Sequence, residues 1–474
     1  MAEIPLPLTT APGARPQESA GRLVNCYAEV LGDTHPGRGV RRRAPGLRNF
    51  GTTARSGFRG LFEANGVLYS AYAGAMEKHG SAGGASTTLT GTLSGTKKGF
   101  FARNNKTPTP DQVFVDPDGN IFVFTTTTVT SGYPDADLPA VNSVTSIDGY
   151  LVFTTGDGRA FATDLNSTAV NALSFAKAEA KPDGLVRGVA LTDRLLLCGT
   201  TSIEIWTDVG TSPFPFARSA AMPIGLAGPH AIAGQEDGWG KGLLFVGNDN
   251  AVHMLAGYET QKVSPPDLDA LIEAVADKSG LEACVYIARG HAFWQLSCPA
   301  WTWVFDLNTL KWHERVSYAI ERARIAGTCF AYGKWLAGDT KTGHIQEVTS
   351  AVHKEIADPF RMRIESGPVQ SFPFGAAIGR ADFNFVTGVG NAAGQDPIET
   401  DPSVEISWSD DGGLTWSNPL IRRLGRQARP EQLVSLVACT GRATWHGRRW
   451  RIDVADPVYA ALIGAMQSED ARVT

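Results

Sequence analysis

The octapeptide Ser409–Trp416, with the sequence SDDGGLTW, combines carboxylates, hydroxyls and an indole in one short stretch. Carboxylates and aromatic rings are groups that sugar-cleaving sites use, so the stretch raises the question whether the chain acts on carbohydrate. It fits the pattern S-x-D-x-G-x-T-W at every defining position, and the pattern occurs once. The matching residues are Ser409, Asp411, Gly413, Thr415 and Trp416.

This pattern resembles the Asp-box of sialidases, which are β-propellers that carry several such boxes on successive blades. In that family the box is a structural hairpin turn that lies away from the active site. Asp411 is expected to accept hydrogen bonds across a turn while Trp416 packs beneath it. Catalysis in the sialidase family would also need an arginine cluster, a Tyr/Glu nucleophile pair and an acid on the propeller face. Adjacent residues such as Tyr258 and Glu259 point to opposite faces of a strand. We interpret the motif as a structural turn.

Other chemical motifs fail at defining positions. The stretch before Gly240-Lys241 lacks the first glycine of a phosphate-binding loop, and Gly388–Gly394 misses the dinucleotide pattern by one residue. H-E-x-x-H and G-x-S-x-G are both absent from the sequence. The sequence therefore predicts no catalytic residues, no metal site and no cofactor, and we expect a protein that is not an enzyme.

Arginines gather near the C-terminus and form a candidate interaction patch. On strands, alternate members of such a group share a face, which could meet carboxylates or phosphates. Solvated charge and pairing between subunits are favoured over contact with DNA. A second basic spot is Arg41–Arg43. The members of the C-terminal patch are Arg422, Arg423, Arg426, Arg429, Arg448, Arg449 and Arg451.

Length and composition indicate a globular protein. The chain has 474 residues, 43% of them hydrophobic and 19% charged, and a formal net charge of −5, which is not typical of a basic nucleic-acid binder. Its first residues show no signal-peptide pattern, and no apolar run approaches the roughly 20 residues of a membrane span. The six cysteines form no C-x-x-C pair, so we expect reduced, mostly buried thiols.

The elements that would position these groups are β-strands. From about residue 58 to 350, β-rich runs alternate with tight turns at pairs such as Asn65-Gly66, Asp118-Gly119, Asp148-Gly149 and Tyr332-Gly333, which suit type I′ hairpins. The units recur at roughly 40 to 50 residues, which is typical of propeller blades. The sequence predicts an all-β fold, a β-propeller of six or seven blades, with stacked β-sandwiches as the alternative. One helix is expected, Asp267–Gly280, packed on the propeller.

Composition shifts divide the chain into three parts. Residues 1–57 are expected to form an N-terminal arm and ring-closing segment, and residues 58–357 the propeller. Residues 358–474 are expected to form a C-terminal β-sandwich with a long loop, 388–402.

Several stretches, taken in order, resemble the packaged-DNA stabilisation proteins of short-tailed bacteriophages, also called tail hub, tail accessory or nozzle proteins. The most specific is Ala180–Trp206, which is similar to that family's P-D-G strand, turn and S-T-I-E run. The remaining carriers are Arg22–Val30, Arg41–Phe50, Trp303–Arg315, Ile406–Ser417 and Arg448–Ala465.

The resemblance implies a structural virion protein of the phage tail, assembled in the host cytoplasm. It implies a homo-oligomer, a hexameric ring below the portal and its adaptor ring, that prolongs the DNA exit channel and helps retain packaged DNA until ejection. Tail needle, fibre or spike proteins would attach nearby, and DNA would pass without sequence-specific binding. The alternative is a carbohydrate-binding or sialidase-like propeller, in which Trp294, Trp301, Trp303 and Trp312 could stack on a sugar.

Overall fold

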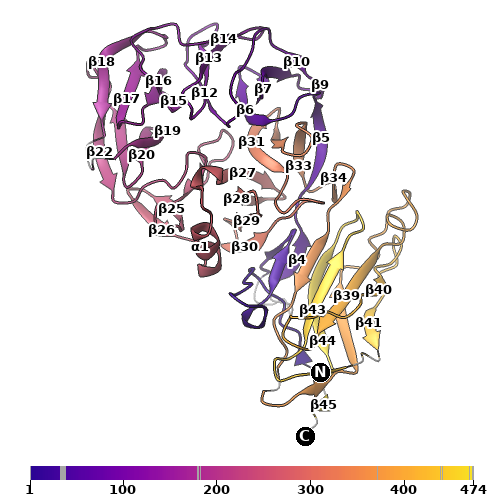
Figure 1. Ribbon diagram of the computed structural model, residues 1–474. Helices are drawn as coiled ribbons and strands as arrows, with labels where there is room; N and C mark the ends of the chain where they lie inside the picture. Colours follow the sequence, from indigo (N-terminus) through magenta and orange to yellow (C-terminus); the bar gives the residue numbers. More distant parts are fainter. Residues whose placement is uncertain are drawn as a thin grey trace. The chain divides into compact units, whose positions relative to one another are not determined.

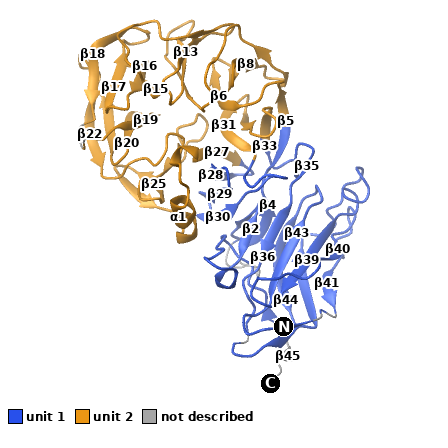
Figure 2. Ribbon diagram, in the orientation of Figure 1, with its two compact units in different colours: residues 1–48, 288–323, 348–474 blue, residues 49–287, 324–347 orange. Residues whose placement is uncertain are grey.

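The computed structural model describes residues 2–31, 39–178, 181, 183–370, 372–437, 439, 441–468 and 470–471. Ala180 and Pro182, which belong to the stretch Ala180–Trp206, and residues 472–474 lie outside them. The chain forms two compact units (Figure 2). Unit 1 comprises residues 1–48, 288–323 and 348–474, and unit 2 comprises residues 49–287 and 324–347.

Unit 2 is a ring of small antiparallel sheets around a central axis (Figure 1). Within the described ranges, five of its sheets have four strands each. They are β6 (Phe58–Ala64), β7 (Val67–Tyr72), β8 (Ala75–His79) and β10 (Thr87–Thr88); β11 (Phe100–Arg103), β12 (Gln112–Val115), β13 (Ile121–Phe124) and β14 (Val129–Ser131); β15 (Ser143–Ile147), β16 (Tyr150–Thr154), β17 (Arg159–Thr163) and β18 (Val170–Lys177); β19 (Leu185–Leu191), β20 (Arg194–Gly199), β21 (Ile203–Asp208) and β22 (Phe216–Met222); and β23 (Ile232–Ala233), β24 (Leu244–Val246), β25 (Val252–Ala256) and β26 (Glu259–Lys262).

The ring closes through a strand from early in the chain. The sheet of β31 (Ile325–Ala331), β32 (Lys334–Asp339) and β33 (Ile345–Thr349) continues into β5 (Gly46–Thr52), which also pairs in parallel with the short β9 (Gly84–Ala85). Phe50 of β5, Phe58 of β6 and Ile345 of β33 belong to one buried cluster. This closure leaves no free edge between the first and the last sheet of the ring, as expected for a propeller.

The hairpin turns follow from residues that tolerate positive φ. Asn65 and Gly66 have φ values of 51° and 75°, and the pairs Asp148-Gly149 and Tyr332-Gly333 are likewise positive at both positions, which confirms the type I′ prediction there. Asp118-Gly119 differs, because only Gly119 has a positive φ, of 88°. Asp116 accepts hydrogen bonds from the N–H groups of Asp118 and Asn120 and so fixes another turn geometry.

The predicted helix forms but is shorter than expected. Helix α1 spans Pro266–Glu273 and buries Leu268 and Ile272, while residues Lys278–Gly280 form a separate 3-10 turn, η2. Lys278 folds back and donates from Nζ to the carbonyl oxygen of Glu273 (3.1 Å), at the end of the helix, and to that of Val275 (2.7 Å), just beyond it. No helix within the described ranges is long and apolar enough to cross a membrane.

Unit 1 is a β-sandwich whose strands come from distant parts of the chain. One layer has the order β3 (Cys26–Glu29), β4 (Val40–Arg43), β44 (Ala461–Gln467), β38 (Arg380–Phe385) and β41 (Val434–Val437), with β1 (Ala2–Glu3) also paired to β44. The other has the order β28 (His291–Cys298), β29 (Trp301–Asp306), β30 (Lys311–Glu314), β2 (Arg22–Val24), β36 (Met362–Glu365), β43 (Arg449–Val454), β39 (Ser403–Ser409) and β40 (Leu420–Arg423). Leu23, Phe383, Ile406 and Trp450 lie in the core between the layers.

Smaller elements complete the chain. They are η1 (Pro16–Glu18), β34 (Lys354–Glu355), β35 (Asp358–Pro359), β37 (Ala376–Ala377), β42 (Arg442–Ala443) and β45 (Asp470–Ala471) in unit 1, and β27 (Glu282–Ala288), most of which lies in unit 2. The all-β class, with a propeller and a β-sandwich, is confirmed by these sheets and by the family comparison below.

Candidate functional site

The octapeptide Ser409–Trp416 forms a closed turn between β39 and β40. The Asp411 carboxylate accepts hydrogen bonds from the Ser409 hydroxyl (2.7 Å), from the Thr415 hydroxyl (2.5 Å) and from the backbone N–H groups of Leu414 (3.0 Å) and Thr415 (3.0 Å). Burial would raise the pKa of Asp411, but these hydrogen bonds outweigh burial and lower it to about 2. Asp411 therefore stays ionised at neutral pH and has no proton to donate.

The two glycines of this turn let it pack against the N-terminal segment. Gly412 and Gly413 have φ values of 81° and 100°, a backbone conformation that residues with a Cβ atom rarely adopt. A Cβ on Gly412 would lie 2.7 Å from Cγ of Gln17, and one on Gly413 would lie 3.4 Å from Cβ of Pro16. The turn thus forms one wall of a cavity whose opposite wall is the segment around η1.

This cavity, which we call the arginine pocket, has a volume of about 220 Å³. Arginine dominates its charged lining, with Glu365 as the one carboxylate among the described residues that line it. The guanidinium of Arg451 forms a cation–π contact with Trp416, and its central carbon lies 3.8 Å from the centroid of the indole ring. The pocket-lining arginines are Arg15, Arg22, Arg449 and Arg451.

The structure divides the predicted C-terminal arginine patch into separate groups. Strand β43 alternates, so that Trp450 faces the core while its neighbours Arg449 and Arg451 face the arginine pocket. Arg448 is fully buried and pairs with Asp410 through two bonds of 2.6 and 2.8 Å. The others, on β40 and the loop that follows it, are Arg422, Arg423, Arg426 and Arg429.

The second basic spot is not a surface feature. Arg41 and Arg43 are 4% and 6% exposed. Arg41 donates to the carbonyl oxygens of Leu6 (2.6 Å) and Pro7 (3.0 Å), and Arg43 donates to that of Val454 (2.6 Å). Burial lowers the pKa of both to about 10. The expectation of a basic spot is wrong for these two residues because their guanidiniums donate to backbone carbonyls inside the protein, while Arg42 is partly exposed and pairs with Glu29.

A second cavity, of about 520 Å³, lies on the axis of unit 2. All seven inner strands of the ring contribute to its wall, which sets the number of inner strands within the described ranges at seven. Five carboxylates and three cations line it, so it is mildly acidic. The inner strands are β6, β11, β15, β19, β23, β27 and β31, and the charged residues are Glu63, Asp148, Glu236, Asp237, Glu282, Arg59, Lys98 and Arg187.

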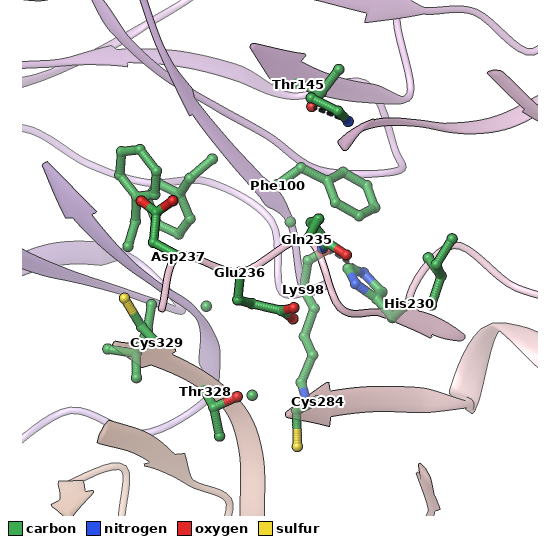
Figure 3. A pocket seen from close by; sticks show the side chains of 18 of the residues that line it. Lys98, Phe100, Thr145, His230, Gln235, Glu236, Asp237, Cys284, Thr328 and Cys329 are labelled. Atoms are coloured by element: carbon green, nitrogen blue, oxygen red, sulfur yellow. Dashed lines mark hydrogen bonds between the residues drawn. The ribbon is translucent and has the colours of Figure 1, made fainter. Parts of the chain in front are cut away.

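Figure 3 labels Lys98, His230 and Glu236 among the side chains that line the axial cavity, and each of these three has a partner within the protein. Lys98 pairs with Glu282 at 2.6 Å. His230 stacks on Phe100 with ring centroids 4.7 Å apart, and burial lowers the pKa of His230 to about 3, so the imidazole is neutral. Burial raises the pKa of Glu236, which accepts the N–H of Gly234 at 2.7 Å. These groups hold the wall together and offer no nucleophile with an adjacent base.

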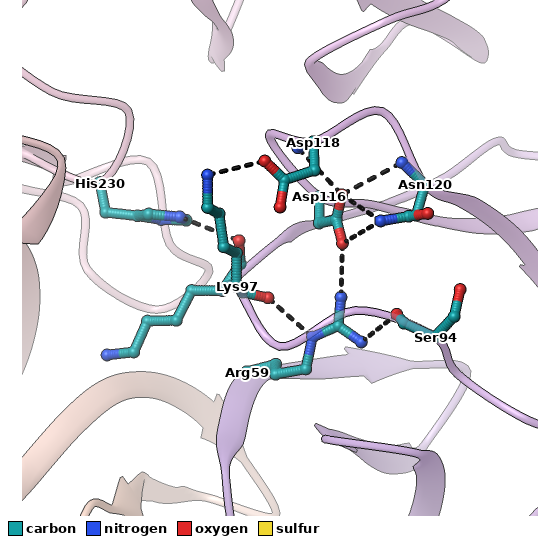
Figure 4. Close-up of polar contacts among 8 residues, drawn as sticks. Arg59, Ser94, Lys97, Asp116, Asp118, Asn120 and His230 are labelled. Atoms are coloured by element: carbon teal, nitrogen blue, oxygen red, sulfur yellow. Dashed lines mark hydrogen bonds and ion pairs between the residues drawn. The ribbon is translucent and has the colours of Figure 1, made fainter.

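Beside the cavity, Arg59 ties two sheets together (Figure 4). It is fully buried and donates to the carbonyl oxygens of Ser94 (2.8 Å) and Lys97 (2.7 Å) and to the carboxylate of Asp116 (2.7 Å). Asp116 also accepts from Asn120. Arg59 lies in β6, and Asp116 directly follows β12. The ion pair therefore joins the first two sheets of the ring. No sequence pattern singled out this pair, because its partners are far apart in the chain.

The tryptophans that could have stacked on a sugar are mostly core residues. Trp294, Trp303 and Trp312 are 0%, 2% and 3% exposed. All six cysteines are free thiols, four of them buried, as expected. Within the described residues, no group of three or more His, Cys, Asp or Glu side chains is placed to hold a metal ion.

A protein-family model described as the β-propeller of Bacteriophage P22 Gp10, a phage-stabilisation family, matches residues 19–353. The chain belongs to this family. The P22 Gp10 propeller family is one of structural phage proteins, so the chain is a bacteriophage structural protein connected with packaged-DNA stabilisation. Its location is the virion.

Comparisons with individual proteins add fold likeness alone. No curated protein matches the chain. Among solved structures, it is similar to PorZ, a bacterial surface component of the type-IX secretion system of Porphyromonas gingivalis, at 14% identity over 71% of this chain and 44% of PorZ, with a TM-score of 0.36. It thus spans less than half the length of PorZ. It is also similar to the WD40 propeller domain of Doa1 (10% identity, 64% of this chain, 96% of that chain, TM-score 0.41) and to the WD40 repeats of RRP9 (10%, 65%, 99%, 0.42).

Proposed function

We propose that the chain is a ring-forming tail hub or nozzle that extends the DNA exit channel below the portal and adaptor, helps retain packaged DNA and anchors distal tail parts. The observation that carries the proposal is the match of residues 19–353 to the P22 Gp10 propeller family. In this proposal the protein forms part of the channel wall and connects neighbouring tail proteins, without a chemical step of its own.

The internal construction supports a load-bearing role. The ring of unit 2 closes through β5, and buried ion pairs brace both units. Arg59–Asp116 and Arg324–Asp339 lie in unit 2, and Arg315–Glu355 lies in unit 1, with every side chain at most 2% exposed. Breaking such a pair leaves an uncompensated charge inside the protein, which resists local opening.

The charge distribution supports a channel that releases DNA. The formal net charge of the chain is −5. Affinity for nucleic acid comes mainly from cations that neutralise phosphates. A chain with this balance does not grip the DNA backbone, so DNA can pass without sequence-specific binding.

The proposed assembly is a homohexamer with cyclic symmetry. Side-by-side contacts between different faces of neighbouring subunits generate a closed ring when the rotation closes. The ring would sit on the portal or adaptor and present attachment points for needle, fibre or spike proteins.

Negative-stain electron microscopy of the purified chain at high concentration tests this proposal, repeated after addition of the portal and adaptor rings of the same phage. We expect six-fold rings, alone or docked below the portal. The matched control is a portal ring from an unrelated phage, which should not recruit the chain. Monomeric discs that ignore the cognate portal would contradict the proposal.

A further inference from the structure

The arginine pocket holds a buried cation, Arg449, that no carboxylate of the described residues contacts directly. Arg449 is 3% exposed, and its Nη2 donates to the carbonyl oxygen of Gln17 at 3.0 Å. Its Nε is buried and has no hydrogen-bond partner among the described residues, and no carboxylate there forms an ion pair with Arg449. Burial lowers the pKa of Arg449 accordingly. A buried guanidinium donor without an acceptor is costly, and the charge of Glu365 reaches Arg449 only through space.

The neighbouring cations are partly neutralised, and the balance stays positive. Arg22 forms two bonds to Glu314, of 3.0 and 2.6 Å, and Arg451 donates to Glu365 at 2.9 Å. These two carboxylates offset Arg22 and Arg451. Arg449 and the exposed Arg15 have no such carboxylate among the described residues, so the pocket carries an excess of positive charge.

We propose that the arginine pocket binds the carboxylate of an acidic peptide segment of another protein. Guanidinium forks match a carboxylate in geometry and charge, and Arg449 Nε is a donor that lacks an acceptor. Pro16 and Gly413 also line the pocket and can contact the aliphatic part of a glutamate side chain.

The shape of the pocket favours a peptide carboxylate over a DNA phosphate. Its volume is about 220 Å³, and its wall joins Arg449, at 3% exposure, with the exposed Arg15. A duplex presents phosphates on a wide convex backbone and needs an open row of cations. The inference rests on this geometry and does not depend on whether the chain forms a ring.

Isothermal titration calorimetry of the full chain tests the proposal with four probes. They are a short peptide that ends in two glutamates, the same peptide with glutamines and an amidated end, inorganic phosphate, and a short DNA duplex. We expect the acidic peptide alone to bind. Arg449→Gln should weaken the affinity for the acidic peptide by about tenfold or more, because a charge-assisted hydrogen bond is lost. Arg423→Gln is the matched control, because Arg423 lies near Asp401 outside the pocket, and should leave binding unchanged.

Thermal unfolding of Arg449→Met separates a binding role from a structural one. Removal of an uncompensated buried charge should leave the melting temperature unchanged or raise it, while peptide binding is lost. A variant that loses stability and binding together would make Arg449 a structural donor to Gln17 and overturn the proposal. Absence of peptide binding by the parent chain, or binding of the duplex or phosphate in its place, would overturn it as well.

Discussion

Asp411 shows how one carboxylate can be fixed by its turn. Its hydrogen bonds come from within the octapeptide and from both hydroxyls of the motif. We expect Asp411→Asn to lower stability by about 1–3 kcal/mol, since the amide accepts fewer of these bonds and leaves donors unpaired. Urea unfolding of the two proteins at neutral pH measures the difference.

The pH dependence of that difference has a defined sign. The pKa of Asp411 falls from 3.8 to about 2 on folding, so its ionised form adds stability above the unfolded value. This contribution is lost as the pH falls from 3.8 towards about 2. The gap in melting temperature between the parent and Asp411→Asn should therefore narrow over this range. A gap that stays constant would mean that the turn does not depend on the charge.

Arg59 and Asp116 allow a sharper test of buried pairing. Asp116→Asn removes the counter-charge of a fully buried guanidinium and should cost about 3–5 kcal/mol. The double variant Arg59→Met with Asp116→Asn should recover part of this loss, because no charge is left buried. Urea unfolding checks both, and Lys97→Gln is the control, since the Lys97–Asp118 pair is exposed. Equal losses in the single and double variants would contradict the explanation.

At the scale of elements, the junction between β32 and β6 closes the ring tightly. A Cβ on Gly338 would lie 2.2 Å from Cζ of Phe58, so Gly338→Ala should overpack the junction and cost about 1–3 kcal/mol. Adding Phe58→Leu should restore part of the stability. Melting temperatures measure both steps, and Gly464→Ala is the control because nothing lies within 4 Å of its Cβ position. No effect of Gly338→Ala would show that the junction can open.

Most of the fold could be predicted from strand and turn patterns in the sequence. Hairpin turns such as Asn65-Gly66 are set by adjacent residues, so the sequence alone indicates them. The arginine pocket could not be predicted in this way. Arg15 and Arg449 are brought together by packing between the ends of the chain, and their spacing in sequence carries no signal. The helix was predicted too long because its periodicity gave no sign of the side-chain hydrogen bonds from Lys278 to the carbonyl oxygens of Glu273 and Val275.

At the scale of the whole molecule, unit 1 depends on strands from both ends of the chain. β2 pairs with β36, and Leu23 lies fully buried in the sandwich core. We expect a chain truncated after residue 357 to expose this core, and to bind a hydrophobic dye and aggregate on purification. Size-exclusion chromatography with the full chain as control measures this. A soluble truncated chain with a sharp unfolding transition would show that the N-terminal strands fold without the rest of the sandwich.

The pairing of β1 with β44 also sets an order in time. Ala2 pairs with Gln467, so β1 waits for a residue that is made 465 positions later. At about 5–20 residues per second, a ribosome needs roughly 20–100 s between them. All residues of unit 2 emerge earlier, so the ring can form while the chain is still being synthesised. The sandwich is completed only after β44 has been made, and until then its early strands lack their partners.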